Sequence, residues 1–132
     1  MTRHESREAA VILLYECELG EFSADEALEI SIEAFDMEVS AVAKENLNGV
    51  LEHKAELDEV IARLSPARTL SRISVLNLTI LRLAVYEMLY CPAVPPKAAL
   101  NEALDIAADF CGDSDKSFIS GLLGTFYRER YE

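Results

Sequence analysis

Apolar residues recur three and four positions apart along almost the whole chain, the spacing that places them on one face of a helix. They predict helices over about 6–19, 23–35, 38–64, 73–90, 96–110 and 114–130, the third of which bends near His53. Gly20 predicts the end of the first helix, and Ser23 followed by Glu26 predicts a capping box at the start of the second. No segment shows the alternation of a strand bounded by turn signals. The pattern therefore predicts an all-α, single-domain bundle of about seven helices over residues 1–132.

The segment 73–90 is apolar on nearly all sides, which is typical of a helix buried on most of its faces. We expect this helix to be the hub of the core. Ser65 and Pro66 predict the end of the helix that precedes it, because proline disfavours a helical residue before it. The sequence CPAVPP that follows the hub predicts a rigid, extended linker, and Pro96 suits the first turn of the next helix.

Charge changes this picture, because the chain carries 24 acidic and 12 basic residues and a net charge of −12. Residues 21–45 alone hold eight acidic side chains against Lys44. Such a balance argues against the basic footprint of an ordinary nucleic-acid binder. Repulsion between exposed charges is screened beyond about 8–10 Å, however, so a binding surface elsewhere on the molecule can still work. The acidic segment is either a solvated helix face or a docking surface for a basic partner.

The sequence offers little reactive chemistry. Its cysteines, Cys17, Cys91 and Cys111, are odd in number and lack CxxC spacing, which argues against disulfides and a zinc site. His4 and His53 are far apart and belong to no visible metal cluster or catalytic triad. No apolar run reaches the roughly 18 residues of a membrane helix, and acidic residues interrupt the start of the chain where a signal peptide would lie. We expect a cytoplasmic, non-enzymatic protein without metal, cofactor or membrane contact.

Four stretches, in this order, resemble the NusB family of transcription antitermination factors. They are SREAAVILLYECEL, GVLEHKAELDEVI, RTLSRISVLNLTILRLAVYEML, and VPPKAALNEALDIAADF with FISGLL shortly after it. The family counterparts read ARExALQALYxxEL, GVLEHxxELDxxI, WSLDRLSxVERAILRLAxYEL and VPxKxxINEAxELAKxF with FVNGVL. The resemblance covers nearly the whole chain and implies an all-helical fold without enzyme activity. It further implies binding of the boxA element of nascent ribosomal RNA, a single-stranded RNA, together with the ribosomal protein NusE. The resulting complex acts on transcribing RNA polymerase, and some family members form homodimers.

The resemblance also marks candidate contact residues. Cations neutralise phosphates, aromatic rings stack on unpaired bases, and a helix start suits an anion. The candidates for RNA binding on these grounds are Arg3, Arg7, Tyr15, Lys97, Asn101, Lys116 and Phe118. The candidates for contact with a protein partner are Asn77, Leu78 and Glu102. Structural alternatives stay open: a solvated helix start for the arginines, core packing for the two rings, and hydrogen bonds within the bundle for Asn101 and Glu102.

Four departures from the family pattern bear on function. Glu5 interrupts the arginine-rich start, Pro96 replaces a tyrosine, Ser117 replaces a lysine, and Leu76-Asn77-Leu78 replaces the triplet VER. With Leu78 in place of a charged residue, we expect a more apolar surface patch there. The departures favour an alternative function, a protein-interaction module whose RNA surface has decayed. A third interpretation, the RNA-binding domain of a ribosomal RNA cytosine methyltransferase, is weaker because the chain ends at Glu132 without room for a catalytic domain.

Overall fold

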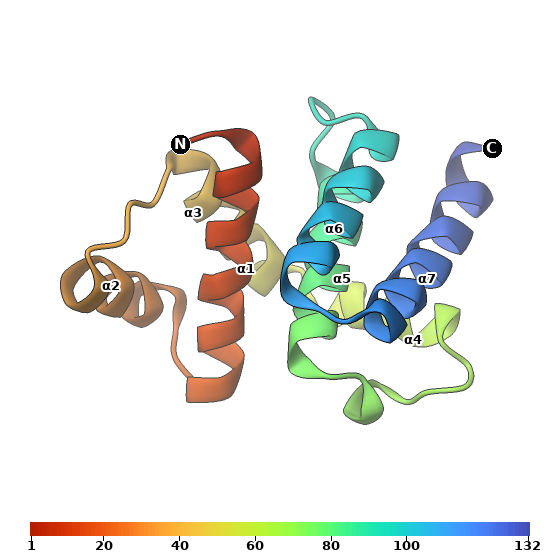
Figure 1. Ribbon diagram of the computed structural model, residues 1–132, viewed down its shortest axis with the longest axis horizontal. Helices are drawn as coiled ribbons and strands as arrows, with labels where there is room; N and C mark the ends of the chain where they lie inside the picture. Colours follow the sequence, from red (N-terminus) through yellow and green to blue (C-terminus); the bar gives the residue numbers. More distant parts are fainter. The chain divides into compact units, whose positions relative to one another are not determined.

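The computed structural model describes residues 1–132 and contains seven α-helices, one short 3-10 helix and no strand (Figure 1). The elements are α1 Arg3–Gly20, α2 Ala24–Phe35, α3 Ala41–Glu52, α4 Lys54–Leu64, η1 Leu70–Arg72, α5 Val75–Tyr90, α6 Pro96–Phe110 and α7 Asp113–Tyr131. The all-helical prediction is confirmed. The chain forms two compact units, residues 1–52 and residues 53–132. The assignment of one domain to residues 1–132 stays a prediction.

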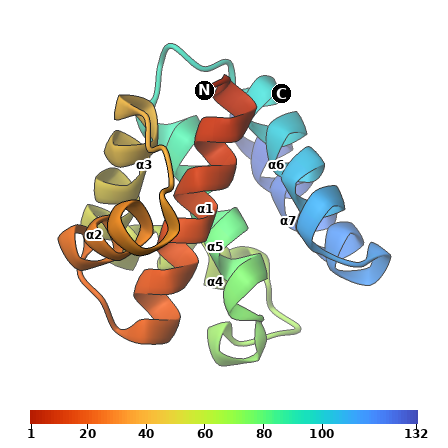
Figure 2. The same cartoon turned by 60° about the vertical axis from the view of Figure 1, so that its left-hand side comes forward.

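In the first unit, α1 packs against both α2 and α3 (Figure 2). The predicted capping box is present at the start of α2, where the Ser23 hydroxyl accepts from the Glu26 amide and the Glu26 carboxylate accepts from the Ser23 amide. Thr2 and Glu5 form a second capping box, at the start of α1, which was not predicted from the sequence. Two reciprocal caps fix where these helices begin.

The end of α1 differs in detail from the prediction. Gly20 is the last helical residue, but the left-handed capping position falls one residue later, on Glu21 with φ 55°. A Cβ atom at Gly20 would lie only 2.4 Å from the Cε2 atom of Phe22. A larger residue at Gly20 would therefore displace the partly exposed Phe22 ring from its place against the end of α1.

The long helix expected over 38–64 is divided in two. α3 ends at Glu52, α4 begins at Lys54, and His53 between them leaves helical geometry with φ −101° and ψ 12°. The break falls where the sequence predicted a bend. The His53 ring stacks on the Tyr90 ring at the end of α5, with 4.0 Å between the ring centroids. This contact fixes the first turn of α4 against α5.

In the second unit, α5 packs against α4, α6 and α7, and α6 packs against α7 (Figure 1). Eleven of the sixteen residues of α5 are buried, and its Ser74 hydroxyl cap accepts a hydrogen bond from the Asn77 amide. The prediction that this helix is a hub is confirmed for this unit. No helix of the molecule has both the length and the apolar character required to cross a membrane.

The proline-rich segment after the hub is a turn, so the predicted extended linker is wrong. The amide of Val94 donates to the carbonyl of Cys91 at 2.9 Å, which closes a four-residue turn with Pro92 in its second position. Proline pre-sets the backbone angle that this position of a turn requires. Pro96 does occupy the first turn of α6, as predicted.

Candidate nucleic-acid interface

The two arginines at the start of α1 have different surroundings. Arg3 is exposed, whereas only 6% of Arg7 is exposed, because Arg7 shares the inward side of α1 with Ser6 and Ala10. The predicted pair of phosphate contacts on one helix face therefore reduces to a single fully accessible cation. A contact of Arg7 with RNA stays a prediction.

Glu5 has a structural role that its place in the basic run concealed. Its carboxylate accepts a hydrogen bond from the Thr2 backbone amide at 3.0 Å, as the second half of the capping box. This hydrogen bond, together with one from the Thr2 side chain, holds the pKa of Glu5 below its ordinary value. Glu5 is therefore ionised at neutral pH and adds a negative charge to the first turn of α1, two residues along the chain from Arg3.

Tyr15 lies further along α1 with 36% of its surface exposed. Ile12 and Leu19 are also exposed, and their spacing places them near Tyr15 on the same side of the helix. The accessible ring argues against the alternative that Tyr15 is a core-packing residue. A base could stack on it, as single-stranded RNA recognition requires.

Two polar candidates share a face at the start of α6. Lys97 and Asn101 are both exposed and stand four residues apart in this helix, so their side chains are neighbours. Pro95 at the cap position contributes no side-chain hydrogen bond, so the amides at this end keep their positive dipole. Glu102 is half-buried on the same helix. The arrangement suits a phosphate approaching Lys97.

The candidates on α7 lie within its first two turns, because α7 begins at Asp113, one residue before the predicted start at Ser114. Lys116 is exposed and Phe118 is half-buried. The guanidinium of Arg68 lies over the Phe118 ring, with its central carbon 4.4 Å from the ring centroid. One face of the ring is thus covered by a cation. Arg68 was not among the candidates selected from the sequence, since it belongs to the connector between α4 and η1.

The expected patch at Asn77 and Leu78 is absent from the surface, which corrects that prediction. Only 1% of Asn77 and 6% of Leu78 are exposed. The side-chain nitrogen Nδ2 of Asn77 donates to Asp115 Oδ1 at 2.9 Å, and the side-chain oxygen Oδ1 of Asn77 accepts from the Cys111 thiol at 3.4 Å. Burial raises the pKa of Cys111, so its thiol keeps the proton that it donates. Asn77 ties α5 to the first turn of α7. Contact of Asn77, Leu78 or Glu102 with a protein partner stays a prediction.

These features define the class of the protein: an all-helical fold that presents cations and rings on exposed helix faces, as a binding protein does. The NusB family model matches residues 4–128. A relative named transcription antitermination protein NusB, from Acetivibrio thermocellus, is 36% identical over 126 residues, which are 94% of this chain and 87% of that protein. The chain belongs to the NusB family. The relatives carry the name of an antitermination factor and not of an enzyme.

Solved structures agree with this assignment. The structure of T. maritima NusB has a TM-score of 0.84 at 26% identity and covers 100% of this chain and 94% of that one. A structure of the antitermination factors NusB and NusE in complex with dsRNA has a TM-score of 0.83, with 98% of this chain and 99% of that one covered. At 20% identity the second likeness shows the fold alone.

Proposed function

We propose that this chain is a transcription antitermination factor that binds boxA-type single-stranded RNA together with the ribosomal protein NusE and carries both to RNA polymerase. The observation that carries the proposal is the family match over residues 4–128. The exposed Arg3, Tyr15, Lys97 and Lys116 support it, because they supply cations for phosphates and a ring for a base. The likeness to the NusB of a complex with NusE and dsRNA supports NusE and RNA as partners. A factor with this role works in the cytoplasm.

A second candidate is a protein-interaction module on the same fold without RNA binding. The burial of Arg7 and the ionised Glu5 in the first turn of α1 favour it, since both weaken the basic start of this helix. The net charge of −12 points the same way. On this alternative the chain would bind NusE but no RNA.

Binding of a labelled boxA-type RNA, with and without NusE, across a potassium chloride series separates the two. We expect NusE to strengthen binding, and the affinity to fall linearly with the logarithm of salt concentration. Binding of NusE without any RNA binding at low salt would support the interaction module instead. Size-exclusion chromatography of the free chain would report in parallel whether it forms homodimers.

A charge reversal tests the cation at the start of α1. Arg3→Glu should weaken RNA binding and lower the salt slope by about 0.7 for each lost phosphate contact on a single strand. Lys44→Glu is the matched control, because Lys44 is an exposed lysine of the same unit and changes the net charge equally. Equal effects of the two substitutions would show that only total charge matters.

A further inference from the structure

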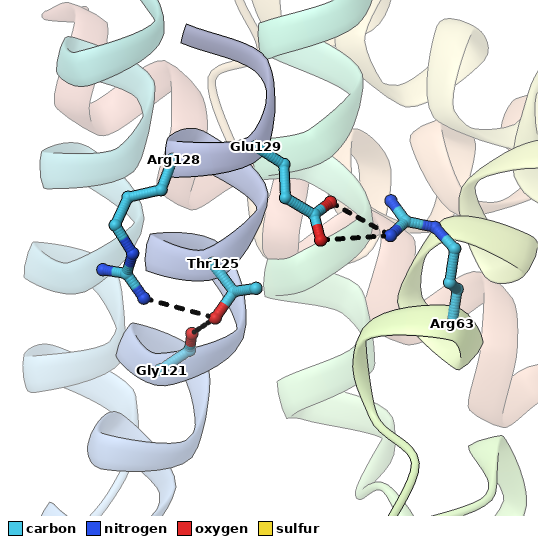
Figure 3. A network of polar contacts seen from close by, with 5 residues as sticks. All are labelled: Arg63, Gly121, Thr125, Arg128 and Glu129. Carbon is cyan, nitrogen blue, oxygen red and sulfur yellow. Dashed lines mark hydrogen bonds and ion pairs between the residues drawn. The ribbon is translucent and has the colours of Figure 1, made fainter. Parts of the chain in front are cut away.

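Positive charge is concentrated in one part of this acidic chain. Residues 60–86 contain no aspartate or glutamate and four arginines, Arg63, Arg68, Arg72 and Arg82. Two of the four are used in ion pairs. Arg82 is buried and forms an ion pair with Asp58 at 2.7 Å. Arg63 forms an ion pair with Glu129 at 3.0 Å, which Figure 3 shows. Arg68 and Arg72 are exposed and make no ion pair with any residue of the chain.

The structure fixes the position of Arg68 more tightly than its exposure suggests. Its backbone amide donates to the Ser65 carbonyl at 3.2 Å, and the buried Ser65 hydroxyl donates to the Arg68 carbonyl, also at 3.2 Å. The connector before η1 is thereby held as a closed turn. The side chain is held at its other end by the Phe118 ring, 4.4 Å below the guanidinium carbon.

A guanidinium stacked on a ring can still donate hydrogen bonds to an anion. The ring takes one flat face and leaves the N–H groups at the edge free to donate. Those groups form a fork that matches two oxygens of a phosphate. Because the stack already restricts the side chain, less rotamer entropy is lost when a ligand binds. Lys116, two residues before Phe118 in α7, is another exposed cation of this unit.

We infer that Arg68 contacts a backbone phosphate of the bound RNA strand and that Phe118 positions Arg68 for this contact. The inference rests on the proposed function, which it deepens by one residue. Phe118 then acts through the guanidinium that covers its ring and not by stacking on a base. Arg68 is the contact residue and Phe118 the positioning residue.

The test compares the binding of labelled boxA-type RNA by the chain with NusE across a salt series. Arg68→Gln should weaken binding roughly tenfold at low salt, the size of one lost charge-assisted contact, and lower the salt slope by about 0.7. Arg63→Gln removes the same charge from the same unit, but its guanidinium faces Glu129. It should change the affinity less than about twofold. Equal slopes for the Arg68→Gln variant and the unaltered chain would overturn the inference.

A double-mutant cycle then separates the role of the ring from that of the cation. If Phe118 acts through Arg68, Phe118→Leu should weaken binding alone but add nothing to Arg68→Gln. Additive losses would mean that the ring meets the RNA itself, which overturns the positioning role. Thermal unfolding of each variant shows whether Phe118→Leu still folds. Absence of RNA binding by the unaltered chain would overturn the proposed function, and a binding chain with an unaffected Arg68→Gln variant would overturn this inference alone.

Discussion

The best-defined charged contact of the molecule joins two helices of the second unit. Arg82 on α5 donates from Nε to Asp58 Oδ1 at 2.7 Å and from Nη2 to Oδ2 at 3.0 Å. The guanidinium is buried, whereas the carboxylate on α4 is partly exposed. A two-pronged contact of this kind fixes both the distance and the rotation of the helices that carry it.

Asp58→Ala should lower the free energy of unfolding by about 3 kcal/mol, because it leaves a buried guanidinium without this carboxylate. Urea denaturation measures the loss. Glu129→Ala removes the partner of the exposed Arg63 and should cost less than about 1 kcal/mol. Similar losses for the two substitutions would show that burial does not decide the strength of these pairs.

At the residue scale, the sequence identified residues with suitable chemistry better than it predicted their burial and contacts. Lys97, Asn101 and Lys116 are exposed, as a binding role requires. Their exposure was predictable, since the spacing of apolar residues along a helix already shows which side faces solvent. Arg7 and Asn77 were selected as surface contacts but are buried, because burial depends on how the helices pack and a motif does not show that packing. Arg68 was missed since its partner Phe118 lies fifty residues away along the chain.

At the scale of elements, α5 organises the second unit. It packs against α4, α6 and α7, and its residues Ile80, Leu81 and Val85 are almost wholly inaccessible to solvent. The near-continuous apolar run predicted this, because a helix covered on several sides needs no polar stripe. Helix starts were predicted unevenly. The helix α3 begins at Ala41, three residues after the expected start, whereas α7 begins at Asp113, one residue before it. Asp113 and Asp115 suit a first helical turn, because their negative charges interact favourably with its dipole.

Leu81→Ala should destabilise the protein by about 2–5 kcal/mol, through lost burial and the cavity left behind. Chemical denaturation followed by circular dichroism gives the value. Leu19→Ala on the exposed side of α1 is the matched control, and a change within about 0.5 kcal/mol is expected for it. A small effect at Leu81 would mean that neighbouring side chains close the cavity.

At the scale of the whole molecule, the family assignment and the charge balance point in different directions. The four motifs predicted both the fold and the family, because their order and spacing extend over nearly the whole chain. The net charge of −12 obscured where a polyanion could bind. The ion pairs of the structure resolve part of this conflict, since they separate the arginines already neutralised from Arg68 and Arg72. No pattern of residue types along the chain carries that distinction.

The acid-free segment 60–86 within a strongly negative chain also has a kinetic consequence. At a salt concentration near 10 mM the screening length is about 30 Å, so the net charge repels an approaching RNA before any arginine can reach it. Near 150 mM it falls to about 8 Å and the repulsion fades, while contacts at close range persist. The association rate constant should therefore rise with salt over this range as the lifetime of the complex shortens, which stopped-flow mixing can resolve. An association rate constant that falls from the lowest salt onward would contradict this.

Basic proteins slide along any nucleic acid, because their net charge attracts it at long range. This chain would instead make few unproductive encounters, and would bind only a strand whose orientation brings it into direct contact with the arginines.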